Sequence, residues 1–173
     1  MLQEYKNQIP DYAKDLKLNV SNIISESPMT QLNAAQIAGI ALASAYATKD
    51  AHLIRVFKSD EALDDANVQA AKSAASIMAM NNVYYRFLHL VHDTEYQQMP
   101  ANLRMNVISN PGISKTDFEL YALAVSAING CGLCMDSHAK VLNKAGVSKA
   151  DIQHAIRIAA VVNGLAQVSK IEE

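Results

Sequence analysis

The sequence predicts an all-α protein, because residues that favour helices dominate and residues that break helices are scarce. Half of the residues are hydrophobic and 18% are charged, whereas only 6 glycines and 4 prolines occur among 173 residues. Hydrophobic side chains recur at helical spacing along most of the chain. This composition excludes a disordered chain and predicts a single domain spanning residues 1–173 with a proper core.

The first half of the chain reads as a series of amphipathic and buried helices. Pro10 suits the first turn of the first helix, and the stretch Ser25-Glu26-Ser27-Pro28 ends it. A later helix carries Tyr84-Tyr85-Arg86-Phe87, which we expect to pack in the core rather than to line a pocket or an intersubunit surface. The predicted helices cover about residues 11–25, 31–48, 50–58 and 64–92.

The second half carries clearer signals for where helices begin and end. Ser114 stands three residues before Asp117, a pattern resembling a capping box. Gly146 suits a left-handed stop after a helix, and Ser148 opens the last helix. The predicted helices cover about residues 115–128, 131–144 and 149–165.

A weak internal repeat relates the two halves. With a shift of about 83 residues, Gln36–Ala41 aligns with Glu119–Ala124. We therefore expect a bundle of two similar helical units, a degenerate one at about 30–92 and a cysteine-bearing one at about 113–166. In this alignment Thr48, Ala51 and Arg55 occupy the places of Cys131, Cys134 and His138.

The only two cysteines lie in the stretch Gly130-Cys131-Gly132-Leu133-Cys134-Met135-Asp136-Ser137-His138. On a helix, Cys134 lies one turn after Cys131, and His138 lies one turn after Cys134, so all three share one face. A helix N-terminus and a nearby imidazole both favour a thiolate, which is the reactive form of cysteine. The spacing predicts a redox dithiol in which His138 activates Cys134 as the nucleophile and Cys131 is the resolving thiol.

Glu119 is the fourth candidate residue, because it lies in an apolar helix before Asn129-Gly130. If the chain folds back there, Glu119 meets His138, orients it and passes a proton. A buried carboxylate would need such a partner. The alternative places Glu119 on an exposed first turn, where it favours the helix dipole.

Two other interpretations of the cysteines stand beside the dithiol. They could be small buried hydrophobic residues that happen to lie three apart. They could also bind zinc together with His138, although no further cysteine or histidine pair completes a tetrahedral set. We expect no metal site, and we expect the remaining histidines to be structural: His52, His89, His92 and His154.

Charge and hydropathy exclude several classes of protein. The net charge is −2 and the calculated pI is about 6.2, so no basic field for nucleic acid is evident. The N-terminus lacks the apolar stretch of a secretory signal. The sequence also contains no run of 18 or more uncharged apolar residues, which is about the length needed to span a membrane. We expect a cytoplasmic protein, and in the cytoplasm a close cysteine pair is more often catalytic or metal-binding than structural.

The pattern Glu119, Cys131-x-x-Cys134 and His138 resembles the alkylhydroperoxidase AhpD group of the carboxymuconolactone decarboxylase superfamily. The similarity extends over nearly the whole chain and includes Tyr12–Asn19, Ala41–Ala45 and Met80–Arg86. One position departs from the family pattern, because Leu133 stands where well-known members carry a histidine. We expect this change to weaken acidification of the thiols.

The resemblance implies an all-α, AhpD-like helical bundle assembled as a homotrimer or higher homo-oligomer. It implies an antioxidant peroxidase that reduces alkyl hydroperoxides or hydrogen peroxide and passes reducing equivalents to a peroxiredoxin partner, AhpC. Its external reductant would be a protein-linked lipoyl group, with no bound organic cofactor. It also implies a Glu119–His138 proton relay with Cys134 as the peroxidatic thiol. The alternative is a non-peroxidase member: a decarboxylase-like, ligand-binding or assembly protein in which the cysteines are incidental.

Overall fold

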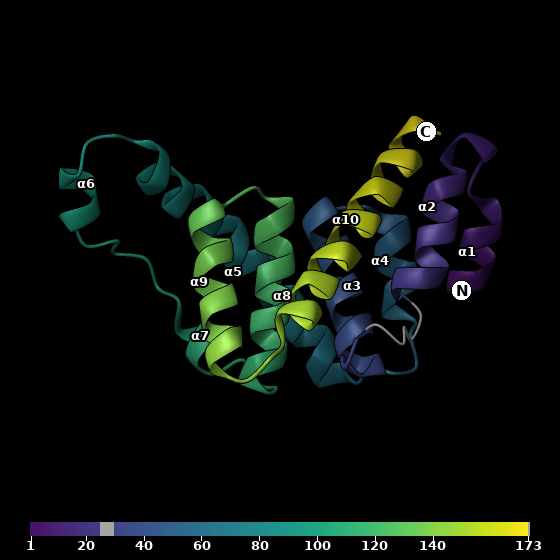
Figure 1. Ribbon diagram of the computed structural model, residues 1–173, viewed down its shortest axis with the longest axis horizontal. Helices are drawn as coiled ribbons and strands as arrows, with labels where there is room; N and C mark the ends of the chain where they lie inside the picture. Colours follow the sequence, from purple (N-terminus) through teal and green to yellow (C-terminus); the bar gives the residue numbers. More distant parts are fainter. Residues whose placement is uncertain (25–29, 173) are drawn as a thin grey trace.

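The computed structural model describes residues 1–24 and 30–172, and every regular element in these ranges is a helix (Figure 1). Two central helices, α3 (Ala34–Thr48) and α8 (Lys115–Ile128), pack against each other. The long helices α5 (Asp65–Leu90) and α10 (Lys149–Ile171) each contact both of them. The all-α prediction is confirmed.

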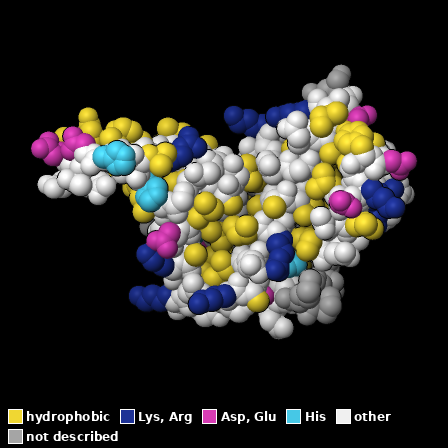
Figure 2. All heavy atoms as spheres, turned by 45° about the horizontal axis from the view of Figure 1, so that its top comes forward, with side chains coloured by type: hydrophobic (Ala, Val, Ile, Leu, Met, Phe, Trp, Pro, Cys, Tyr) yellow, Lys and Arg dark blue, Asp and Glu magenta, His cyan; other side chains and the backbone are white. Residues whose placement is uncertain are grey.

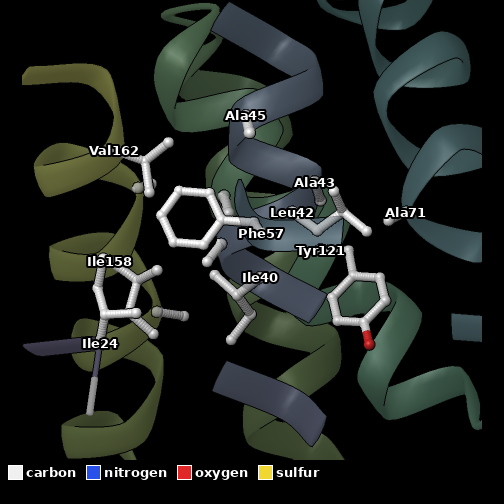
Figure 3. Packing of buried hydrophobic residues seen from close by; sticks show 14 of the residues in the cluster. Ile24, Ile40, Leu42, Ala43, Ala45, Phe57, Ala71, Tyr121, Ile158 and Val162 are labelled. Carbon is white, nitrogen blue, oxygen red and sulfur yellow. The ribbon is translucent and has the colours of Figure 1, made fainter. Parts of the chain in front are cut away.

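The core forms where α3 meets its neighbours (Figure 3). Helix α3 is buried without interruption from Ile37 to Ala45, so its small side chains let other helices approach closely. A Cβ atom at Gly39 would overlap the Tyr121 ring, which therefore needs a glycine there. The Tyr121 hydroxyl donates to Asn67 Oδ1 over 3.0 Å, which satisfies its one polar group.

Two shorter helices complete the pairs around the core. Helix α4 (Ala51–Lys58) follows α3 and packs against it, and its Phe57 ring lies between α3 and α10 in Figure 3. Helix α9 (Gly132–Lys144) follows α8 and packs against α8 and α5. The predicted helices from residue 31 onward are all present, and the left-handed stop at Gly146 is confirmed by its φ of +89°.

The N-terminal region differs from the single helix predicted over residues 11–25. A helix that was not predicted, α1 (Leu2–Gln8), comes first, and the chain then winds through three short segments. Val20 and Ile24 of the last segment are both buried, and this segment packs against α10. Three segments of different pitch thus stand in place of one regular helix, and the last of them packs against α10. The short segments are η1 (Asp11–Ala13), α2 (Lys14–Asn19) and η2 (Val20–Ile24).

The expected break at Ser25-Glu26-Ser27-Pro28 lies outside the described residues. At the other terminus, α10 runs past the predicted end at about 165 as far as Ile171. Gly164 lies inside this helix, and the Leu16 side chain packs where a Cβ atom would stand. Leu165 and Val168 beyond it are buried, and their burial favours the longer helix.

A projecting arm consists of the end of α5 and residues 91–105, which carry α6 (Glu95–Gln98). The chain then returns to the body at α7 (Asn106–Ser109) (Figure 1). The hydrophobic side chains of the arm are unusually exposed, including Phe87, Leu90, Tyr96 and Met99. Within the described ranges, no helix has the length and hydropathy needed to cross a bilayer.

Helix order is the same in the two halves, since a central helix, a shorter helix and a long helix succeed one another in each. The caps place Asp50 opposite Cys131, rather than Thr48 as the sequence alignment had it, because both residues begin the shorter helix. Counting on from these caps puts Leu53 opposite Cys134. The caps of the two halves are Asn33, Asp50 and Asp64 in the first and Ser114, Cys131 and Ser148 in the second. A duplication origin stays a prediction.

Candidate active site

A tight turn between α8 and α9 carries the first cysteine into the site. Gly130 adopts a left-handed φ of +70°, which a residue with a Cβ atom adopts at a cost. The N–H of Gly130 donates to Ala127 O and the N–H of Cys131 to Ser126 O, both over 3.1 Å. These bonds satisfy the last carbonyls of α8 and turn the chain so that α9 runs back along α8.

Polar side chains of α5 hold this turn in place. Arg86 Nη1 donates to the carbonyl of Asn129 over 2.7 Å. Asn82 accepts from Asn129 Nδ2 and donates to Ser126 Oγ, each over 2.9 Å. Because Asn82 is almost fully buried, its amide positions the turn through satisfied hydrogen bonds.

Cys131 and Cys134 form a disulfide, and their Cα atoms lie 5.3 Å apart. Cys131 caps α9, with its Sγ accepting the backbone N–H of Cys134 over 3.3 Å. Cys131 is fully buried, whereas Cys134 is 7% exposed. The disulfide contradicts the interpretation of two unconnected hydrophobic residues, and Cys134 is the more exposed of the two cysteines.

The structure brings Glu119 and His138 together, as the fold-back at Asn129-Gly130 predicted. His138 Nδ1 lies 2.6 Å from Glu119 Oε2, and both side chains are buried. The alternative of an exposed Glu119 is therefore wrong. The second ring nitrogen, Nε2, lies 3.3 Å from the sulfur of Met78 on α5. Nδ1 thus faces the carboxylate, and Nε2 is the ring nitrogen on the side away from Glu119.

A cavity of about 450 Å³ opens beside these residues, between α5, α8, α9 and the α7 region. Cys134, Glu119 and His138 line it, whereas Cys131 does not. Its other walls are mainly hydrophobic and include Leu133, the residue that departs from the family pattern. The cavity therefore admits a small molecule with an apolar part next to one cysteine and one imidazole.

Met78, Asn81 and Met105 of the cavity were not singled out from the sequence, whereas Tyr85 belongs to a cluster for which a pocket was the alternative to core packing. Met78, Asn81 and Tyr85 lie on one face of α5, and Met105 comes from the chain that returns from the arm. The expected core packing of Tyr84-Tyr85-Arg86-Phe87 is wrong, because Tyr85 lines this cavity and Phe87 is 47% exposed. The i, i+3, i+7 spacing on α5 was the available signal, since these positions share a helix face.

The other histidines lie away from this pair. His154 is buried on α10 and its Nε2 lies 2.9 Å from Ile23 O, while the ring of His52 packs edge-on against that of Tyr5. His89 lies nearer the motif, with its Nε2 3.9 Å from where a Cβ atom of Gly132 would stand. Among residues 1–24 and 30–172, no group of three or more His, Cys, Asp or Glu side chains is placed to hold a metal ion.

A helical protein with a disulfide beside a cavity, and with a buried carboxylate–imidazole pair at the same cavity, has the make-up of an oxidoreductase. Comparison with known proteins agrees with this class. The sequence model of the carboxymuconolactone decarboxylase family matches residues 94–171.

Curated relatives match nearly the whole chain. A protein of Coxiella burnetii named alkyl hydroperoxide reductase AhpD is 67% identical, over 99% of this chain and 98% of its own length. Proteins of the same name from Rhodopseudomonas palustris and Maricaulis maris are 52% and 50% identical, over 95% and 96% of this chain and 91% and 96% of their own lengths. This chain belongs to the AhpD family of the carboxymuconolactone decarboxylase superfamily, and its prediction as an enzyme of the oxidoreductase class is confirmed.

Proposed function

We propose that this protein is a thiol-dependent alkyl hydroperoxide reductase of antioxidant defence that also acts as a disulfide reductase. The observation that carries the proposal is the placement of Cys134. It is the cysteine that lines the cavity, and the cavity also holds the Glu119–His138 pair. The names of the relatives support the substrate class.

In the reduced protein, His138 would accept the proton of the Cys134 thiol. The carboxylate of Glu119, 2.6 Å from Nδ1, keeps a proton on that nitrogen and stabilises the imidazolium that forms. Nε2 is then the base, and it lies on the side of the ring that Met78 contacts. Both partners are buried, which strengthens their electrostatic interaction relative to one in water.

The Cys134 thiolate would attack the terminal oxygen of the hydroperoxide. A sulfur–oxygen bond forms, the oxygen–oxygen bond breaks, and the alkoxide takes the proton from His138 and leaves as an alcohol. Cys134 is then a sulfenic acid. Cys131, one turn away on the same helix, attacks that sulfur and expels water, which gives the Cys131–Cys134 disulfide.

A dithiol would restore the pair by two exchange steps. Its first thiolate attacks Cys134, the sulfur at the cavity, and Cys131 leaves as a thiolate. The N–H of Cys134 lies 3.3 Å from Cys131 Sγ and favours that thiolate at the N-terminus of α9. We propose a protein-linked lipoyl group as the external dithiol and an AhpC-type peroxiredoxin as a protein partner, in the cytoplasm and with no bound cofactor.

The projecting arm supports assembly into a homotrimer or higher oligomer. Figure 2 shows hydrophobic side chains along the arm, with acidic and histidine side chains among them. Leu90 and Met99 are 65% and 55% exposed, more than an isolated chain would normally leave to water in one projecting segment. A second copy covering the arm would bury this surface.

The proposal is tested by peroxide consumption with dihydrolipoamide as reductant. Wild type is compared with Cys134→Ser, Cys131→Ser and a matched control, Asp136→Asn, which changes an exposed residue of the same helix. We expect turnover to be lost in both cysteine variants and kept in the control. Mass measurement of the cysteines in the same samples should show the disulfide only in the proteins that turn over.

The alternative of a non-peroxidase member with incidental cysteines makes the opposite prediction. Full activity of some other kind in both cysteine variants, with no reversible disulfide in wild type, would favour it. A disulfide that forms without peroxide consumption would point to a different oxidant, and Leu133 at the cavity would be the first residue to examine.

A further inference from the structure

Met105 is a cavity residue for which the proposed chemistry has no role. It enters the cavity from the chain between the arm and α7 and shares the cavity with Cys134 and His138. Its side chain is half-buried, whereas Met78, the other methionine of the cavity, is only 1% exposed. Of the two methionines of the cavity, Met105 is therefore the more exposed.

Two hydrogen-bond donors of α5 converge on the Met105 sulfur. Asn81 Nδ2 lies 3.2 Å from Sδ, and the hydroxyl of Tyr85 lies 4.0 Å from it. Asn81 is buried, so its amide has exchanged hydrogen bonds with water for a hydrogen bond to the thioether sulfur, which is a weak acceptor. A sulfoxide oxygen on the same sulfur would be a much stronger acceptor for both donors.

We propose that Met105 is a modification site, oxidised to methionine sulfoxide by the hydroperoxide that occupies the cavity. This inference rests on the proposed function, which supplies the oxidant. A lone pair of the sulfur attacks the terminal oxygen of the hydroperoxide. The oxygen–oxygen bond breaks, a sulfur–oxygen bond forms, and the alkoxide leaves with the hydroxyl proton as an alcohol. The sulfur is oxidised by two electrons and the peroxide is reduced by two.

Binding in the cavity is what makes this oxidation selective. A hydroperoxide held there meets the sulfur at a high effective concentration, which an exposed methionine elsewhere lacks. Met99 is the matched comparison, because it lies on the nearby arm and is 55% exposed. Exposure alone would make Met99 the faster of the two, whereas cavity binding makes it Met105.

Oxidation of Met105 would lower the activity of the enzyme when peroxide is in excess over the reductant. A dithiol reverses the Cys131–Cys134 disulfide, but methionine sulfoxide needs a dedicated reductase. The new oxygen makes an apolar wall polar at the place where an alkyl group would pack. The oxidised protein should therefore lose activity toward an apolar hydroperoxide even after full reduction of its cysteines.

The test exposes the reduced full-length protein to excess cumene hydroperoxide, restores the cysteines with dithiothreitol, and locates added oxygen by peptide mass spectrometry. We expect oxygen at Met105 several-fold sooner than at Met99. Asn81→Leu and Tyr85→Phe should each slow oxidation of Met105 and leave that of Met99 unchanged. Equal or faster oxidation of Met99 in wild type, or an unmodified Met105, would overturn the proposal.

Activity measured on the same samples tests the consequence. Each protein is compared with its own unexposed sample, and the lasting loss in wild type should be absent in Met105→Leu and present in Met99→Leu. A loss that persists in Met105→Leu would overturn the role of this residue. The two proposals fail separately: no dithiol-dependent turnover before exposure removes the proposed function, whereas normal turnover with Met105 unmodified removes only this inference.

Discussion

The turn that joins α3 to α4 and the turn that joins α8 to α9 are built alike, yet one leads to chemistry and the other to packing. Lys49 and Gly130 both adopt the left-handed conformation, with φ of +62° and +70°. The next residue then caps the shorter helix, with Asp50 accepting the N–H of Leu53 and Cys131 accepting that of Cys134. The same backbone arrangement thus carries a carboxylate in one half and a thiol in the other.

The side chains at matching positions of α4 and α9 lie in different surroundings. Leu53 and Phe57 are buried in the hydrophobic core, and His138 stands on α9 where Phe57 stands on α4. His138 instead pairs with Glu119 at the cavity beside α5. A helical turn of this kind positions whichever side chains it carries, and the function depends on whether they face a core or a cavity.

Removal of the His138 imidazole should have the largest effect. His138→Ala should lower turnover at neutral pH by roughly 10²–10⁴-fold, the usual contribution of a general base. Raising the pH should restore part of the rate, because a free cysteine ionises near pH ~8.5 without help. A pH–rate profile measures this, and a rate unchanged at every pH would remove His138 from the mechanism.

The residue opposite His138 should matter for stability. Phe57→Ala leaves a cavity in the core and should lower the free energy of unfolding by about 3–5 kcal/mol. Urea denaturation measures this loss. Under conditions in which Phe57→Ala remains folded, its peroxide turnover should equal that of wild type. A large loss of turnover without a loss of stability would contradict the division between the two halves.

Glu119 should show a smaller catalytic effect than His138. Glu119→Gln keeps an acceptor oxygen for Nδ1–H but removes the charge that stabilises the imidazolium, so turnover should fall less than in His138→Ala. Counting on from the helix caps, Ala38 is the residue of the first half that corresponds to Glu119. Ala38→Ser is therefore the matched control. Wild-type turnover in Glu119→Gln would leave Glu119 with a structural role only.

Loss of the helix cap at Asp50 should have a smaller effect, on stability alone. Asp50→Ala removes the acceptor for the N–H of Leu53 and should cost about 1 kcal/mol of stability, with little change in turnover. Asp50→Asn retains a capping oxygen and should cost less. Identical urea midpoints for wild type and Asp50→Ala would mean that this cap contributes nothing.

Asp151 in the second half should give the smallest effect, visible as a dependence on pH. Burial acts to raise the pKa of Asp151, but hydrogen bonds from Ser148, Thr30 and the N–H of Gln31 outweigh it, so the pKa is lowered. The unfolded chain therefore binds this proton more tightly than the folded one. The stabilisation is complete above the ordinary carboxyl pKa, near ~3.9, and is lost as the pH falls through the lowered value.

Urea midpoints measured from neutral to acidic pH test this assignment. Asp151→Asn should lower stability at neutral pH and flatten the acid limb of the curve. A variant with the same acid limb as wild type would contradict it.

Much of the fold and the four candidate site residues could be predicted from the sequence, because their signals are local. The i, i+3, i+7 spacing of Cys131, Cys134 and His138 fixes one helix face, and Asn129-Gly130 signals the turn that brings Glu119 to it. The choice between a buried and an exposed Glu119 could not be made from the sequence, because burial depends on how the helices pack.

The remaining features depend on contacts between distant segments. Met105 reaches the cavity only because the arm returns to the body, and Asn82 contacts Ser126 and Asn129 across two helices. A thioether beside an imidazole has no pattern of its own in a sequence. The N-terminal segments differ from the prediction in a region where α2 and η2 pack against α10, at the other end of the chain.

The dithiol mechanism is tested most directly by a single turnover of the fully reduced protein with one equivalent of cumene hydroperoxide, followed by rapid quenching and mass measurement. We expect one alcohol to be released for each Cys131–Cys134 disulfide formed, and a sulfenic acid to be trapped on Cys134 in the Cys131→Ser variant. Peroxide consumed while both cysteines stay reduced, or a sulfenic acid on Cys131 in the Cys134→Ser variant at the wild-type rate, would contradict it.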